Sequence, residues 1–216
     1  MKKLIVFDMD GTLADTSPGI INSHRYAHDQ MGRPQPDSEV LESVIGGPLL
    51  NTYISRFGFP EDQARLAVAH YRAYYAEKGL LEASLYPGMK EAIFQLKESG
   101  YYLAVATLKA ECFVKRMLEA MQIATCFDAI FGMDNADTRT KSEIIQMCMK
   151  QVGVEAKETI MVGDSVHDLL GADQAGVDFV GVTYGFGFQN SEELKNRPSC
   201  KNPSELLCTI ASLNCN

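Results

Sequence analysis

Residues 4–12 of the chain read LIVFDMDGT. The first four residues are all apolar, which is typical of a strand that is buried on both faces of a parallel sheet. Two carboxylates, Asp8 and Asp10, follow at alternate positions, and Gly11 lets the backbone turn at low steric cost. An acidic turn that only caps the strand is the plainer interpretation. We favour a functional site, because open α/β sheets bind ligands at the carboxyl ends of their strands.

Four further apolar runs each end in a turn and precede a helical pattern. They lie at residues 102–106, 129–133, 159–162 and 179–183. Nearly continuous apolar strands that alternate with helices predict an α/β core, with a parallel sheet covered on both faces. The helical patterns, such as that of residues 141–152, carry apolar stripes that we assign to core packing.

A long segment without strand-like runs separates the first strand from the second. It carries helical patterns at residues 19–31, 38–44, 49–57 and 60–78. The last of these opens with Pro60 and two acidic residues, which suit the first turn of a helix. We therefore predict an all-helical inserted domain at residues 15–86, and a core domain formed by residues 1–14 and 87–216.

Composition excludes several functional classes. The chain has 20 Lys and Arg against 28 Asp and Glu, and its net charge of −8 argues against a nucleic-acid partner. No stretch approaches the roughly 20 apolar residues that span a bilayer. Asp8 also ends the opening apolar run too early for a signal peptide. We expect no membrane association and a cytoplasmic location.

The six cysteines show neither metal-site nor redox-motif spacing. We expect them to be reduced thiols, because a chain of this length can bury enough apolar surface without cross-links. A bridge among Cys200, Cys208 and Cys215 is the alternative.

A second acidic element, GDSVHD at residues 163–168, follows the apolar run 159–162. Asp164 and Asp168 are four residues apart, so they share one face if a helix starts here, although helix capping by Asp164 would also explain the pattern. Carboxylates that converge at one sheet edge repel one another unless a cation is present. An all-oxygen set of ligands suits Mg²⁺ better than zinc. The sequence therefore predicts a Mg²⁺ site.

Two further polar elements are weaker when taken alone. Thr107 ends the strand 102–106, where its hydroxyl and the neighbouring backbone N–H groups could hold an anion, and Leu108 and Lys109 follow it. Lys141 opens a predicted helix and would otherwise be interpreted as a solvated surface lysine.

Taken in order, these elements resemble the four motifs of the haloacid dehalogenase (HAD) superfamily of phosphohydrolases. The motifs correspond to residues 8–12, Thr107, Lys141 and residues 163–168. The resemblance implies a Rossmann-like parallel sheet, with the insert as a helical C1-type cap domain. The stretch between Thr107 and Lys141 is too short to hold the larger cap of other members.

The resemblance also implies roles for individual residues. Asp8 would be a nucleophile that forms an aspartyl-phosphate, and Asp10 would protonate the leaving alcohol and then activate water. Thr107 and Lys141 would hold the phosphoryl oxygens. Asp8, the Asp10 carbonyl and Asp164 would bind Mg²⁺ with support from Asp168, and the substrate would contact Gly11, Thr12, Gly47, Leu108 and Lys109.

Within the superfamily the chain looks most like the phosphoglycolate phosphatase and 5′-nucleotidase branch, through segments such as Tyr86-Pro87-Gly88 and residues 181–187. We expect a hydrolase of a small phosphomonoester that is a monomer or a homodimer. A mutase of the β-phosphoglucomutase type and a non-catalytic phosphometabolite-binding protein are the alternatives. Asp10 disfavours a dehalogenase, which lacks an acid at this position. In the insert, the candidates to face the substrate are Asp15, His24, Arg25 and the turn at residues 46–48, although a histidine satisfied on a helix is the plainer interpretation of His24.

Overall fold

The chain forms two compact units. The computed structural model describes residues 1–216 except 47–48, 135–137, 195 and 215–216. The core unit comprises Met1–Asp15 and Ser84–Asn216, and the helical unit comprises Thr16–Ala83. From the sequence, the inserted domain was predicted to begin at residue 15 and to end at residue 86. The structure differs because a short strand β2 (Ala14–Asp15) pairs antiparallel with β3 (Ser84–Leu85), so both belong to the core unit.

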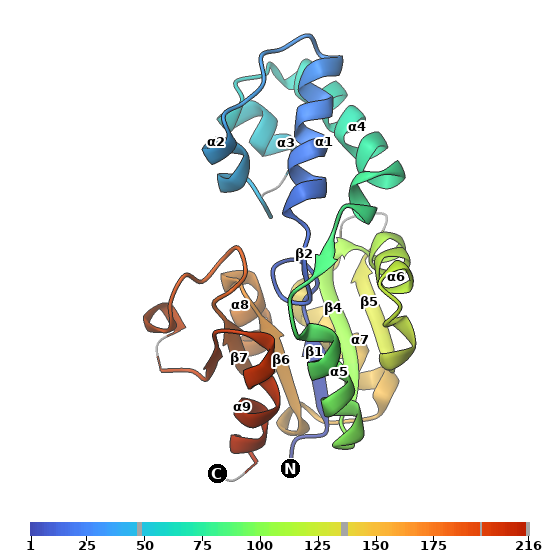
Figure 1. Cartoon of the computed structure of the whole chain (residues 1–216), viewed down its shortest axis with the longest axis vertical. Coiled ribbons are helices and arrows are strands. Elements are labelled where there is room, and N and C mark those ends of the chain that lie inside the picture. The colour runs from blue at the N-terminus through green and yellow to red at the C-terminus, as the bar shows by residue number, and fades with distance from the viewer. Residues whose placement is uncertain (47–48, 135–137, 195, 215–216) are drawn as a thin grey trace. The chain divides into compact units, whose positions relative to one another are not determined.

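Within the described residues, six parallel strands form one sheet in the core unit (Figure 1), which confirms the predicted parallel sheet. Its order is β5-β4-β1-β6-β7-β8. The strands are β1 (Leu4–Phe7), β4 (Tyr102–Ala110), β5 (Ala129–Met133), β6 (Thr159–Gly163), β7 (Asp178–Val182) and β8 (Ser199–Cys200). The sequence missed β8, because two residues are too few to produce a pattern.

Strand β1 lies near the middle of the sheet, and all four of its residues are buried. Leu4 and Val6 face a cluster that includes side chains of α7 (Lys141–Val152) and α8 (Val166–Ala175). Figure 1 shows α5 (Met89–Glu98) and α9 (Leu206–Ser212) on the opposite face of the sheet. Helix α6 (Glu111–Ala120) packs against β4 and β5. The sheet is therefore covered on both faces, which is why β1 reads as an unbroken apolar run.

Two helices of the core unit begin with reciprocal capping contacts. The Thr140 hydroxyl accepts the Glu143 N–H, and the Glu143 carboxylate accepts the Thr140 N–H. Ser165 and Asp168 make the same pair of contacts at the start of α8. Asp164 is therefore not a cap and lies outside the helix, contrary to the arrangement in which Asp164 and Asp168 share a helical face.

The helical unit is built on two antiparallel helices, α1 (Ser17–Gln30) and α4 (Glu61–Glu77), which pack along each other. Between them lie α2 (Ser38–Ser43), α3 (Leu49–Asn51) and a π-helical turn at Thr52–Arg56, so the predicted helix 49–57 is two segments. A 3₁₀ turn at Gly79–Leu81 follows α4. It lies so close to α1 that a Cβ atom on Gly19 would collide with the Gly79 carbonyl.

An aromatic cluster with two histidines fills the helical unit. The His24 ring lies 4.7 Å from the Tyr71 ring and 5.3 Å from the Phe57 ring, and its Nδ1 shares a 3.1 Å hydrogen bond with the Tyr53 hydroxyl. His24 is only 1% exposed, so it is a residue of the helical core. Burial, followed by the nearby His28, lowers the His24 pKa to about 4.

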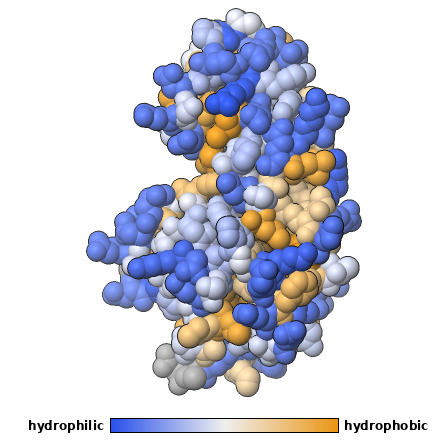
Figure 2. All heavy atoms as spheres, viewed as in Figure 1, coloured by the Kyte–Doolittle hydropathy of each residue, from blue (hydrophilic) through white to orange (hydrophobic). Residues whose placement is uncertain are grey.

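Hydrophilic side chains cover much of the face seen in Figure 2, and hydrophobic residues form smaller groups on it. Across the described residues, no helix has the length and apolar character needed to cross a membrane. The five cysteines of the described residues are free thiols, as expected: Cys112, Cys126, Cys148, Cys200 and Cys208. Cys215 lies outside the described residues.

We predict that acid destabilises the protein partly through His24. Its pKa falls from an ordinary value of 6.5 to about 4 in the folded state, so the unfolded chain binds the proton more readily. The stability that depends on neutral His24 is complete above pH 6.5 and is lost as the pH falls towards 4, by roughly 3 kcal/mol. Urea unfolding between pH 7.5 and 4.5 measures this loss.

In a His24→Gln variant the free energy of unfolding should fall less steeply over that pH range. His167 is exposed, and His167→Gln serves as the control with the wild-type slope. Parallel pH profiles for the wild type and His24→Gln would show that His24 carries no such linkage.

Candidate active site

Two carboxylates meet at the carboxyl edge of the sheet because their strands are neighbours in register. Phe7 of β1 pairs with Val162 of β6, and the Asp8 N–H donates to the Val162 carbonyl at 3.0 Å. Asp8 follows Phe7, and Asp164 directly follows β6. Both are buried. The parallel pairing therefore places the first and last predicted motifs side by side.

Lys141 joins two of the carboxylates. Its Nζ lies 2.6 Å from Asp8 Oδ1 and 2.6 Å from Asp168 Oδ1. The residue is only 6% exposed, so Lys141 is part of the site and not a surface lysine. Because it is the first residue of α7, the Thr140 cap fixes the point from which its side chain reaches Asp8.

The acidic residues form an oxygen-rich cluster that fits a divalent cation. Carboxylate oxygens of Asp8, Asp164 and Asp168 all lie within 4.8 Å of one another, and all three residues are buried. Burial raises the pKa of Asp8 to about 7, and the neighbouring carboxylates add to this shift while Lys141 opposes it. Burial, followed by Asp168, raises the pKa of Asp164 to about 6. Such a set of hard oxygen donors matches the ligands of Mg²⁺.

The oxygens of this cluster differ in how many partners they already have. Asp164 Oδ2 accepts the N–H groups of Phe186 at 2.8 Å and Gly187 at 3.0 Å, whereas Oδ1 has the Thr12 hydroxyl at 3.5 Å. Both Asp168 oxygens are engaged, Oδ1 by Lys141 and Oδ2 by the Ser165 N–H and hydroxyl. Asp164 Oδ1 and Asp8 are therefore better placed to hold a cation, and Asp168 is better placed to support them.

Asp10 has a cation of its own. Lys109 Nζ lies 3.0 Å from Asp10 Oδ1, and the Lys109 side chain is only 9% exposed. The Lys109 N–H also donates to the Thr107 hydroxyl at 3.2 Å, and Thr107 is buried. Leu108 is 39% exposed between them. From the sequence we predicted that Lys109 contacts substrate. Nothing in the sequence indicated that Lys109 pairs with Asp10.

Two of the expected substrate contacts, Gly11 and Thr12, lie against Asp164. Gly11 has a positive φ of 74°, and a Cβ atom on it would collide with the Asp164 carboxylate. Thr12 is fully buried, with its hydroxyl directed to Asp164. Gly47, the remaining predicted substrate contact, lies outside the described residues.

A loop that the sequence analysis used for the family resemblance, but did not place in the site, also reaches it. Residues 184–187 follow β7, and their backbone N–H groups hold Asp164 as described above. Gly185 and Gly187 could have indicated that this loop lies in the site, because a loop that approaches other backbone closely has no room for Cβ atoms.

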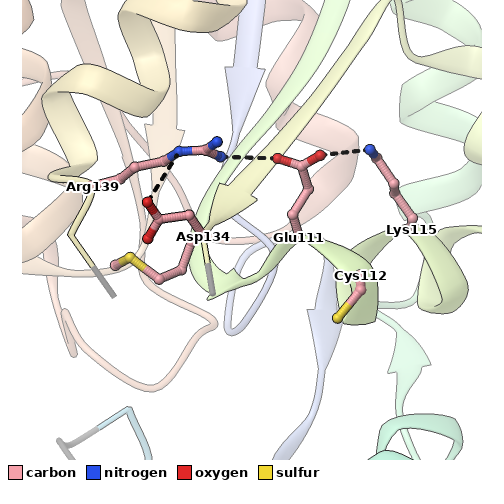
Figure 3. Close-up of a pocket in the computed structure, with 6 residues that line it drawn as sticks. Glu111, Cys112, Lys115, Asp134 and Arg139 are labelled. Carbon is pink, nitrogen blue, oxygen red and sulfur yellow. Dashed lines mark hydrogen bonds and ion pairs between the residues drawn. The ribbon is translucent and has the colours of Figure 1, made fainter. Parts of the chain in front are cut away.

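A separate hollow of about 350 Å³ opens at the end of β5 and the start of α6 (Figure 3). Its charged groups pair with one another. Arg139 Nη1 donates to Glu111 Oε2 at 3.0 Å and to the Gly132 carbonyl at 2.8 Å, and Lys115 pairs with Glu111 at 2.6 Å. The Arg139 contacts tie the segment that leads into Lys141 to β5 and α6.

Comparisons with known proteins identify the family. Residues 5–182 match the family described as haloacid dehalogenase-like hydrolase. A 5′-nucleotidase of Pseudomonas aeruginosa is 39% identical over 187 residues, which are 86% of this chain and 85% of that protein. A phosphoglycolate phosphatase of Colwellia psychrerythraea is 28% identical over 87% of each chain.

A solved structure of a haloacid dehalogenase-like hydrolase from Streptococcus pneumoniae is also similar. It superposes with a TM-score of 0.87 at 31% identity, over 97% of this chain and 98% of that chain. The chain therefore belongs to the haloacid dehalogenase-like hydrolases. It is a phosphatase of this family, as the resemblance of its motifs implies.

We predict that Lys141→Ala destabilises the fold and impairs the site together. The variant leaves Asp8 and Asp168 buried without their shared cation, a change that typically costs about 3–5 kcal/mol. Urea unfolding in EDTA measures this loss. Lys150→Ala is the matched control, because Lys150 is exposed on the same helix and should change stability by no more than about 0.5 kcal/mol. Equal stabilities of the two variants would contradict the structural role.

Proposed function

We propose that the protein is a Mg²⁺-dependent phosphomonoesterase that acts through an aspartyl-phosphate on Asp8. The observation that carries the proposal is the placement of Asp8. It lies at the end of the central strand, with its carboxylate 2.6 Å from Lys141 and beside Asp164 and Asp168. This is an arrangement in which a carboxylate can meet a phosphoryl group among fixed positive and metal-binding groups.

The chemistry divides into two steps. In the first, an Asp8 oxygen bonds to phosphorus as the bond from phosphorus to the leaving oxygen breaks, and Asp10 gives that oxygen a proton. In the second, water attacks the aspartyl-phosphate and gives its proton to Asp10. Phosphate is released and the Asp8 carboxylate is regenerated, so both aspartates return to their starting states.

Positive groups support both steps. Bound Mg²⁺ would neutralise charge on the transferring phosphoryl group. Lys141 stabilises the ionised form of Asp8, which burial disfavours. The Thr107 hydroxyl and Lys109 lie at the end of β4, the strand next to β1, where they could bind phosphoryl oxygens. Contacts of Gly11, Thr12, Leu108 and Gly47 with substrate belong to the same proposal.

We propose a small phosphorylated metabolite of the phosphoglycolate or 5′-nucleotide type as substrate. The support comes from the two relatives named above, which cover most of this chain. A panel of phosphoglycolate, 5′-nucleotides and sugar phosphates, with p-nitrophenyl phosphate as a generic substrate, tests this class directly.

We predict that Asp8→Asn abolishes phosphate release from every substrate in the panel, by more than about a thousandfold. The amide has nearly the same shape but is a far weaker nucleophile, and Lys141 keeps its contact with Asp168, so the far-ultraviolet circular dichroism should not change. Asp62→Asn changes an exposed aspartate of α4 and serves as the control with normal activity. Turnover retained by Asp8→Asn would rule out Asp8 as the nucleophile.

We also predict that Mg²⁺ stabilises the protein and is required for turnover. A cation that binds only the folded state raises stability by about 2.7 kcal/mol at a hundredfold excess over its Kd. EDTA should remove activity, and added Mg²⁺ should restore it and raise the melting temperature of the wild type. Asp164→Asn should reduce that thermal shift. A melting temperature that does not respond to Mg²⁺ would contradict a cation site among these carboxylates.

A further inference from the structure

The loop after β7 makes one contact that the proposed chemistry does not require. The Tyr184 hydroxyl donates to the Thr12 carbonyl at 3.1 Å. Thr12 lies in the turn after β1, between Asp10 and the strand β2. A tyrosine on one loop therefore holds the backbone of the turn that carries Asp10.

That turn is closed by its own hydrogen bonds on both sides of Thr12. The Leu13 and Ala14 N–H groups both donate to the Met9 carbonyl at 3.1 Å, and the Gly11 N–H donates to the Ala14 carbonyl at 3.0 Å. Because these bonds make residues 9–14 one compact piece of backbone, fixing the Thr12 carbonyl also restricts Asp10.

The Tyr184 side chain is itself held in place. Its ring lies 4.8 Å from the Tyr86 ring at an interplanar angle of 62°, an edge-to-face contact. The Tyr86 N–H donates to the Leu13 carbonyl at 3.2 Å. Tyr86 follows β3, so the segment that re-enters the core unit packs on Tyr184 and bonds to the same turn.

The backbone next to Tyr184 is equally constrained. Phe186 and Gly187 donate to Asp164 Oδ2, and the Phe188 N–H donates to the Asp164 carbonyl at 2.7 Å. A Cβ atom on Gly185 would collide with the Gly11 carbonyl, so the loop and the turn are in direct contact. These contacts hold the loop beside the turn, with the Tyr184 hydroxyl within hydrogen-bond distance of the Thr12 carbonyl.

We propose that Tyr184 is a positioning residue, whose hydroxyl fixes the Thr12 carbonyl and thereby the orientation of Asp10. Burial raises the pKa of Tyr184, so the hydroxyl stays protonated and keeps its role as donor. The catalytic consequence rests on the proposed function, in which Asp10 delivers a proton to the leaving oxygen. The effect on the turn itself does not depend on that function.

The test is Tyr184→Phe, which keeps the ring contact with Tyr86 and removes only the hydroxyl. A misplaced Asp10 should slow departure of an alcohol, which needs a proton, more than departure of p-nitrophenolate, which does not. We expect kcat/KM to fall about fivefold for the alkyl phosphate that the wild type hydrolyses fastest, and less than twofold for p-nitrophenyl phosphate. Equal losses on both substrates, or no loss, would overturn the proposal.

Hydrogen exchange gives a second readout that does not involve activity. Amide exchange in residues 9–14 of Tyr184→Phe should accelerate about fivefold, while exchange in β6 stays at the wild-type rate. Unchanged exchange in residues 9–14, or equal acceleration in both segments, would overturn the role of the hydroxyl. This arm decides the matter even if the wild type hydrolyses none of the phosphates, a result that would refute the proposed function alone.

Tyr102→Phe is the matched control. Tyr102 begins β4 at the opposite end of the sheet from the site, and the residue is 46% exposed. Loss of its hydroxyl should leave both kcat/KM values and the exchange of residues 9–14 unchanged. A similar fall in Tyr102→Phe would show that the effect of Tyr184→Phe is not specific to the Thr12 contact.

Discussion

The Lys141 ammonium group, buried between Asp8 and Asp168, organises the carboxyl edge of the sheet. Taking such charges out of water costs several kcal/mol for each ion, and the cost is recovered only when the partners are held in close contact. The chain achieves this with two helix starts. Lys141 is the first residue of α7, and Asp168 belongs to the capping box at the start of α8. The packing of α7 on β1, and of α8 on α7 and β6, therefore sets the distance between the charges.

The charges at this edge do not balance. Three buried carboxylates lie around one ammonium group, so the cluster has an excess of negative charge. Burial is the main cause of the raised pKa of Asp8 and Asp164, and the neighbouring carboxylates add to it. A hard cation removes that excess and favours ionised Asp8. The residual cost of assembling like charges is offset by backbone N–H groups, two of which bind one oxygen of Asp164. The same residues thus explain both why the cluster fits a divalent cation and why a tightly packed loop surrounds Asp164.

The sequence predicts features that depend on local pattern. Five of the six strands of the sheet are visible as apolar runs, and the motif order indicates the family that the comparisons confirm. What it misses depends on contacts between distant segments. Strands β8, β2 and β3 are each two residues long, and the pairing of Lys109 with Asp10 joins the end of β4 to the turn after β1. The sequence leaves His24 either facing the substrate or satisfied within the helical domain. Its contacts with Tyr53 and Tyr71, which lie far along the chain, support the second interpretation.

The antiparallel pairing of β2 with β3 has a consequence for how the fold could arise and be altered. Ala14 pairs with Leu85 and Asp15 with Ser84, so the chain leaves and re-enters the core unit at neighbouring points. A two-residue hairpin loop has the right span to join paired strand ends of this kind. The helical unit is therefore, in topology, an insertion in the loop of one β-hairpin. Evolution or a designer can lengthen, exchange or delete this insertion without changing the strand order of the sheet.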